Sequence, residues 1–159
     1  MQKKDHWESI YSTRDSRAVS WFQEHAAVSL DLIRSSACPR DGYIIDVGGG
    51  ASTLVDDLLA DGYRDVSVLD ISGPALRAAR ARLGERADEV TWLEEDITQA
   101  VLPEGHYDLW HDRAVFHFLT DEADRRRYVE AVRRVVRPGG HVIVATFGLF
   151  VLIINTALL

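Results

Sequence analysis

The chain has 159 residues, of which 47% are hydrophobic and 27% are charged, as in an ordinary soluble domain with one core. Its net charge of −7 argues against nucleic acid or an anionic membrane as an electrostatic partner. Cys38 is the only cysteine, which excludes a disulfide within the chain and a zinc site built on several thiolates. We expect no metal site. We also expect a cytoplasmic location, since the N-terminus lacks the apolar core of a signal peptide.

Predicted helices and strands alternate along the chain. Apolar spacing predicts helices over residues 5–11 and 19–35, and Pro39-Arg40-Asp41-Gly42 then breaks the helical pattern. Short apolar runs predict strands over residues 43–47, 66–69, 90–93, 107–110 and 141–147. Further helices are predicted after the first strand, from Ser72 with its capping hydroxyl, and from Asp121 with its capping carboxylate. This alternation requires right-handed crossovers, so we predict an α/β, Rossmann-like, mostly parallel sheet with helices on both faces.

The most informative segment follows the first strand. Asp46 closes that strand, Gly48-Gly49-Gly50 follows, and a helical pattern begins at once, as where a parallel strand passes to a helix through a turn that a ligand can touch. The second strand again ends in an acid, Asp70, some twenty residues later. A glycine turn paired with an acid at the next strand tip indicates a nucleoside cofactor, with Asp70 placed for the ribose hydroxyls.

The same segment distinguishes three cofactor classes. A nucleoside triphosphate loop needs Lys-Ser or Lys-Thr after its glycines, and residues 51–54 contain no lysine. A dinucleotide site needs a further glycine at the position that Thr53 occupies, and Asp46 would repel a diphosphate. An acid at this place suits a ligand with positive charge, such as an ammonium or a sulfonium group.

These motifs resemble those of class I S-adenosylmethionine-dependent methyltransferases. The resemblance extends over residues 43–147 through five segments in the family's order: 46–52, Asp70, 95–97, 107–112 and 137–144. It implies that S-adenosylmethionine is the cofactor and S-adenosylhomocysteine the product. The cofactor contacts that it implies are Asp46, Gly48, Gly49, Gly50, Ser52, Asp70, Ile71, Asp96, Ile97 and Asp112. Ser52 departs from the glycine that the family often has there.

The N-terminal segment resembles a narrower group. Residues 6–11 and 19–22 are similar to the start of the small methyltransferases related to the lysine methyltransferases of elongation factor and citrate synthase. In that group the segment lies over the cofactor cleft. Its aromatic residues would exclude water beside the substrate or dock two helices on the sheet. Residues 1–42 are therefore expected to form a helical cap on the cofactor-binding core of residues 43–147.

Candidate catalytic residues follow the fourth predicted strand, whose tip faces the substrate in this family. Asp112 would orient or deprotonate an amine, or cap the next helix; we weigh the two roles equally. His111 would act as a base or a structural anchor, and Arg113 would pair with a substrate carboxylate or with an acid inside the cleft. We expect a solvated face from the four arginines of an earlier predicted helix: Arg77, Arg80, Arg82 and Arg86.

The apolar tail, residues 148–159, does not match the family, which would add a helix and two strands. We therefore expect a sheet without the usual final antiparallel strands. Either the tail pairs with the fifth strand, within one subunit or across a homodimer, or the chain is a shortened product. The predicted function is methyl transfer to a protein lysine or a small molecule. The alternative is a catalytically silent module that binds the cofactor or a partner.

Overall fold

A six-stranded sheet forms the centre of the computed structural model, which describes residues 26–113, 115–146 and 151–156. The strands are β1 (Tyr43–Val47), β2 (Asp65–Asp70), β3 (Val90–Glu94), β4 (Tyr107–Arg113), β5 (Val136–Ala145) and β6 (Val151–Asn155). They lie in the order β3-β2-β1-β4-β5-β6, and each pair is parallel except β5 with β6. The predicted α/β, mostly parallel architecture is confirmed.

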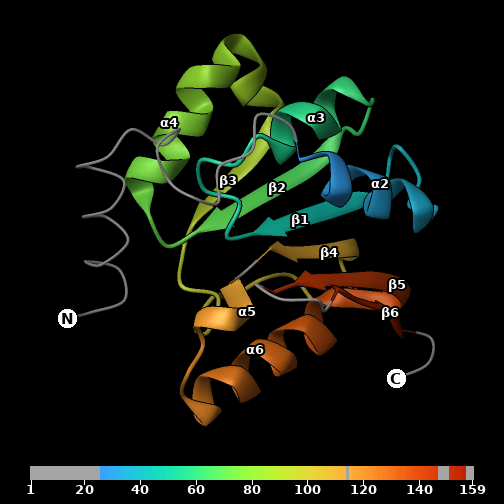
Figure 1. Cartoon of the computed structure of the whole chain (residues 1–159), viewed down its shortest axis with the longest axis vertical. Helices are drawn as coiled ribbons and strands as arrows, with labels where there is room; N and C mark the ends of the chain where they lie inside the picture. Colours follow the sequence, from blue (N-terminus) through green and yellow to red (C-terminus); the bar gives the residue numbers. More distant parts are fainter. Residues whose placement is uncertain (1–25, 114, 147–150, 157–159) are drawn as a thin grey trace.

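Helices cover both faces of this sheet (Figure 1). On one face lie α2 (Ala27–Ser35), α3 (Leu54–Ala60) and α4 (Gly73–Leu83), which continues into the 3-10 helix η2 (Gly84–Glu89). On the other face lie α5 (Val115–Phe118) and α6 (Glu122–Val135). Each layer encloses its own cluster of buried apolar side chains, because alternate residues of a strand point to opposite faces.

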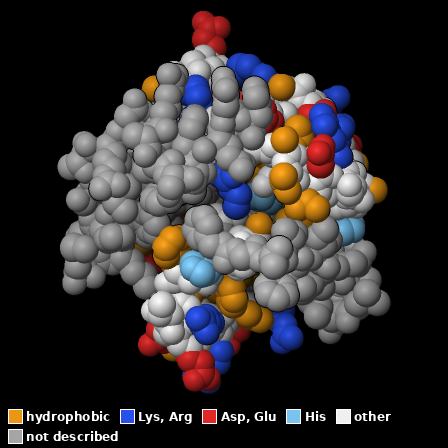
Figure 2. Space-filling model, in the orientation of Figure 1, with side chains coloured by type: hydrophobic (Ala, Val, Ile, Leu, Met, Phe, Trp, Pro, Cys, Tyr) orange, Lys and Arg blue, Asp and Glu red, His pale blue; other side chains and the backbone are white. Residues whose placement is uncertain are grey.

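The predicted helix caps are present. The Ser72 hydroxyl accepts a hydrogen bond from the Ala75 amide at 3.3 Å, and Asp121 accepts one from the Ala123 amide at 2.7 Å. The outer face of α6 is polar, and acidic and basic side chains mix where this helix lies, at the lower end of Figure 2. Its inner face buries Tyr128, Ala131, Val132 and Val135. This division of polar and apolar faces holds α6 against the sheet.

Two strands differ from the prediction by three residues or more at one end. β4 continues three residues past the predicted end at Trp110, so the candidate catalytic residues lie within a strand. β5 begins at Val136 rather than at His141, because residues 137–140 form an irregularity in the pairing with β4. In that register Tyr107 lies opposite Val136 and Leu109 lies opposite His141, so the extra residues are accommodated on one strand.

The tail pairs with β5 as one antiparallel strand, as one of the two hypotheses for the tail predicts, in place of the usual final strands. His141 lies opposite Asn155 and Ala145 lies opposite Val151, so β6 occupies the edge of β5 within the same chain. The homodimer predicted through this edge is therefore not supported. The expected N-terminal helix over residues 5–11 and the aromatic residues up to Phe22 lie outside the described residues, and α2 forms the end of the second expected helix.

We predict that a chain ending after Thr146 aggregates. Without β6, the edge of β5 presents unpaired backbone amides and carbonyls, which pair with other chains. Size-exclusion chromatography with light scattering would measure the loss of monomer. A chain ending after Thr156 retains β6 and is the matched control; equal monomer fractions for both chains would contradict the prediction.

Candidate functional site

The glycine turn, residues 48–53, connects β1 to α3 at the carboxyl edge of the sheet. Gly48 and Gly50 have φ angles of +72° and +34°, in the region that favours glycine. The Gly48 amide donates to the Leu69 carbonyl at 2.7 Å, and the Ser52 amide donates to the Gly49 carbonyl at 2.7 Å. These bonds attach the turn to β2 and close it upon itself.

Two carboxylates lie directly behind this turn. A Cβ atom at Gly49 would lie 2.5 Å from Oδ2 of Asp46, and one at Gly50 would lie 2.5 Å from Oδ2 of Asp70. Real Cβ atoms do not approach other atoms so closely, so the backbone can rest on these acids only because neither residue has a side chain. The structure thus places the acids at the ends of β1 and β2 against the predicted cofactor turn.

Asp46 belongs to a buried chain of three polar side chains. Its Oδ1 lies 2.7 Å from Nδ1 of His111, and Nε2 of His111 lies 3.0 Å from the Ser29 hydroxyl of α2. A neutral imidazole that donates from Nδ1 and accepts at Nε2 satisfies both contacts. The order matches that of a nucleophilic serine triad, but Ser29 is only 5% exposed. We therefore interpret these hydrogen-bonded side chains as a structural support for Asp46.

Asp70 is buried with few hydrogen-bond donors. Its Oδ1 accepts a bond from the Ser72 amide at 2.8 Å. Burial raises the pKa of Asp70 to about 7; the Ser72 amide opposes the shift, and the negative charge of Asp46 adds to it. A ligand that brings hydroxyl or cationic donors to this buried carboxylate would stabilise its charged form.

Asp112 supports α5 on the opposite face. It lies beside Val47 in the register of β1 and β4, and its two oxygens accept bonds from the amides of Val115 at 2.7 Å and Phe116 at 3.0 Å. The Tyr128 hydroxyl donates to Asp112 at 2.5 Å. Burial raises the pKa of Asp112 to about 6, and these bonds act against the rise. The capping role is thus present; a role toward an acceptor stays a prediction.

Helix α5 covers one end of the glycine turn. A Cβ atom at Gly48 would collide with Cγ2 of Val115, the first residue of α5. Because Asp112 holds the start of α5, it also sets how closely this helix approaches the turn. The hydrogen bonds of Asp112 therefore extend to the glycine turn through Val115.

The remaining predicted residues have mixed placements. Ser52 accepts a bond from the Leu54 amide at 3.2 Å, next to the turn. Asp96 forms a local turn in which Oδ1 accepts bonds from the amide and the hydroxyl of Thr98. Ile97 belongs to the apolar cluster on the α6 face. Ile71 and Arg113 are half-buried at the ends of β2 and β4.

The site has the chemistry of a ligand with positive charge and hydroxyl groups. Asp46 and Asp70 carry carboxylates at its back, and a diphosphate would meet them as like charges. Gly48 is half-buried and Gly49 and Gly50 are buried, and none of the three carries a side chain that would keep a ligand away from the backbone. The residues present thus fit a sulfonium nucleoside better than a dinucleotide. Within the described ranges, no group of three or more His, Cys, Asp or Glu side chains could hold a metal ion.

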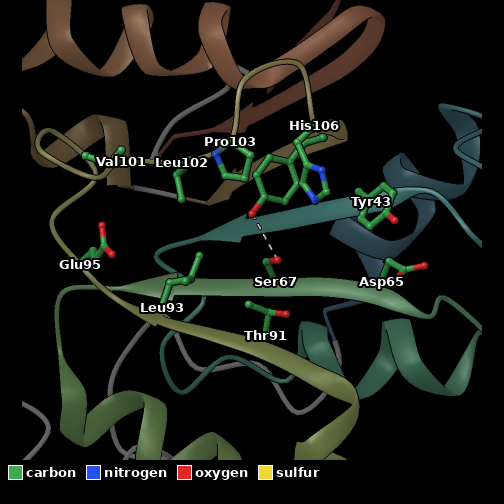
Figure 3. A pocket seen from close by; sticks show the side chains of 11 residues that line it. Tyr43, Asp65, Ser67, Thr91, Leu93, Glu95, Val101, Leu102, Pro103 and His106 are labelled. Carbon is green, nitrogen blue, oxygen red and sulfur yellow. Dashed lines mark hydrogen bonds between the residues drawn. The ribbon is translucent and has the colours of Figure 1, made fainter.

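A separate cavity of about 240 Å³ lies between the β2–β3 face and the β3–β4 connection (Figure 3). The Tyr107 hydroxyl donates to the Ser67 hydroxyl on β2, with the two oxygens 3.3 Å apart. Tyr43 and His106 close one end, and their rings lie 4.2 Å apart. None of the predicted site residues lines the cavity, so it is distinct from the glycine turn.

Several supporting residues were missed by sequence reasoning. Ser29 and Tyr128 lie on helical stripes that predict only packing, and their partners are 82 and 16 residues away. Arg82 was expected on a solvated face, but its guanidinium contacts the glycine turn. No local sequence pattern predicts such contacts, because they form only when the sheet topology brings distant residues together.

We predict that the unliganded chain loses stability as the pH rises from about 4 to about 7. Asp70 in the folded chain holds its proton up to about pH 7, whereas in the unfolded chain it releases it near 3.8. Between these values folding retains a proton that unfolding releases, so stability falls with pH, by at most about 4 kcal/mol. Asp112 acts in the same direction up to about pH 6.

Urea unfolding at several pH values would measure this slope for the wild type and for Asp70→Asn. The variant lacks the titrating carboxylate, so its free energy of unfolding should depend less on pH. Parallel curves for the two proteins would contradict the assignment.

A second prediction concerns the buried chain behind the turn. His111→Ala leaves the Asp46 carboxylate and the Ser29 hydroxyl buried without their imidazole partner, which should lower the free energy of unfolding by about 3 kcal/mol. His117→Gln, at an exposed position of α5, is the control and should change it by less than about 0.5 kcal/mol. Chemical denaturation at pH 7 measures both, and equal values would refute the support role.

Known proteins share both this sequence and this fold. The model of a family described as "Methyltransferase domain" matches residues 44–140. The eEF1A lysine and N-terminal methyltransferase of Bos taurus is 27% identical over 142 residues, which are 86% of this chain and 20% of that protein. Its Drosophila melanogaster homolog is 28% identical over 86% of this chain and 21% of its own length. The chain thus spans about a fifth of the length of these curated relatives.

Solved structures agree with this placement. A S-adenosylmethionine-dependent methyltransferase from Mesorhizobium loti has a TM-score of 0.61 and 26% identity, over 76% of this chain and 53% of that one. Phosphoethanolamine N-methyltransferase 1 of Haemonchus contortus has a TM-score of 0.73 at 17% identity, over 89% of this chain and 30% of that one, which shows the shared fold. The family match covers more than half of the chain. The chain therefore belongs to the methyltransferase-domain family, and its resemblance to the class I S-adenosylmethionine-dependent methyltransferases is confirmed.

Proposed function

We propose that this domain binds S-adenosylmethionine across the glycine turn and transfers its methyl group to a lysine amine of a protein. S-adenosylmethionine is the cofactor of this class of domain. The observation that carries the proposal is the close packing of Gly49 and Gly50 on the buried carboxylates of Asp46 and Asp70. That arrangement gives a stretch of backbone without side chains, with two carboxylates behind it.

The acids have separate proposed contacts. Asp70, at the end of β2, accepts hydrogen bonds from the ribose hydroxyls. Asp46 attracts the ammonium end through its charge behind the turn, and His111 holds it there. Asp96, after β3, accepts a bond from the adenine amine with the oxygen that Thr98 does not occupy. The backbone of residues 48–50, with Ser52, Ile71 and Ile97, completes the proposed walls.

In this proposal the protein positions the reacting groups and excludes water from them. When bound, the cofactor would supply a methyl group on a positively charged sulfur; the nitrogen of a neutral amine would bond to the methyl carbon in line as the carbon–sulfur bond breaks, and S-adenosylhomocysteine would leave. The protein must align the amine and exclude water, and a base is needed only if the amine arrives protonated. Asp112 and Arg113, at the end of β4, are the proposed residues on the acceptor side. His111 acts in this proposal through Asp46 rather than as a base.

The relatives support a protein lysine as the acceptor. Several of them carry the name eEF1A lysine and N-terminal methyltransferase, at 26–27% identity over 142 residues. The acceptor assignment is our proposal, since this chain matches one fifth of those proteins. A cytoplasmic location belongs to the same proposal. No helix within the described ranges has the length and apolarity to cross a membrane.

The cofactor part is tested by calorimetry with S-adenosylhomocysteine on the wild type and Asp70→Asn. Loss of the ribose acceptor should raise the dissociation constant about tenfold or more. Asp65→Asn is the matched control, because Asp65 is an exposed acid at the other end of β2, and it should change the constant by less than about twofold. Equal affinities in all three proteins would contradict the site.

The acceptor part is tested by transfer of labelled methyl from S-adenosylmethionine into a cell lysate. Recovery of the label as methyl-lysine after acid hydrolysis would support the proposal. Label in the small-molecule fraction would replace the protein acceptor by a metabolite. Cofactor binding without transfer to either fraction would favour a catalytically silent module.

A further inference from the structure

Arg82 differs from the other arginines of its segment. It lies in the last turn of α4 and extends to the glycine turn, where Nη1 donates to the Ala51 carbonyl at 3.1 Å and Nη2 donates to the Ser52 carbonyl at 2.7 Å. By contrast, Arg86 pairs with Glu89 three residues away, with both side chains about half exposed. Arg82 thus lies at an exposed position, as expected, but its guanidinium also contacts the glycine turn.

The same guanidinium binds the first turn of α3. Nε and Nη2 donate to the Asp56 carboxylate at 3.0 and 2.6 Å, and the two side chains are 28% and 31% exposed. Asp56 thereby fixes the plane of the guanidinium that contacts the carbonyls. Such a planar fork on a carboxylate is geometry that lysine cannot reproduce.

Bonds within the glycine turn also act at this end: the Ser52 amide donates to the Gly49 carbonyl at 2.7 Å, and the Ser52 hydroxyl accepts from the Leu54 amide at 3.2 Å. Glycine residues gain more freedom in a loose turn than other residues do. The bonds from Arg82 to the carbonyls of Ala51 and Ser52 therefore restrain the segment that follows Gly50.

From this geometry we propose that Arg82 is a positioning residue for the cofactor. It holds the glycine turn from outside in the conformation that receives S-adenosylmethionine, without touching the ligand itself. This inference rests on the proposed function for the location of the cofactor. Loss of this restraint should weaken cofactor binding more than it slows methyl transfer, because a loose turn must be ordered each time the cofactor binds.

The test compares Arg82→Gln and Arg82→Lys with the control Arg86→Gln. Calorimetry with S-adenosylhomocysteine should show a dissociation constant about tenfold higher for Arg82→Gln. Arg82→Lys should recover only part of that loss, since it keeps the charge but not the fork. Arg86→Gln should stay within about twofold of the wild type. In turnover, KM for S-adenosylmethionine should rise while kcat changes little.

Hydrogen exchange of the unliganded proteins gives a readout that needs no cofactor. Peptides spanning residues 48–58 should exchange faster in Arg82→Gln, whereas peptides of β5 should not change. Unchanged exchange and unchanged affinity in Arg82→Gln would overturn the proposal. If Arg82→Gln fails to fold, Asp56→Asn, which removes only the anchor of the guanidinium, decides by the same two measurements. If the wild type binds no S-adenosylhomocysteine, the proposed function fails, and exchange alone judges the restraint.

Discussion

The turn between β1 and α3 depends on contact between backbone and buried carboxylate. Asp46 and Asp70 end two neighbouring strands, and the chain passes over them where it has no side chains. Burial of the Asp70 carboxylate is unfavourable and raises its pKa, and the negative charge of Asp46 adds to the rise. The protein offsets this for Asp46 with an imidazole and for Asp70 with an amide.

Support for the turn comes from both faces of the sheet. On the α2 side, Ser29 and His111 hold the carboxylate of Asp46. On the α6 side, Tyr128 and Asp112 hold the start of α5. These networks are buried and fully hydrogen-bonded at the named atoms, so they favour one arrangement of the chain over looser alternatives. The glycine turn is thus supported by side chains from the helices of both layers.

Local patterns predicted what local physics decides. The limits of β1, the cap at Ser72 and the cap at Asp121 follow from apolar runs and from side chains that satisfy helix amides. The acids at the strand tips could be located because parallel strands end at one edge. The pairing of Ser29 with His111 spans 82 residues, and the irregularity in β5 depends on its register with β4. Such features arise from tertiary packing, which leaves no periodic signal.

The alternation of β4 has a consequence for how this domain tolerates insertions. His111 and Asp112 are adjacent in sequence, yet one serves the α2 face and the other the α6 face. One residue added to the strand before His111 would exchange these faces and disrupt both networks together. Changes in length must therefore be absorbed by the connection after β3, whose exposed residues Pro103, Glu104 and Gly105 form no helix or strand. Within β4 itself, a single added residue is not tolerated, because successive residues face opposite sides of the sheet.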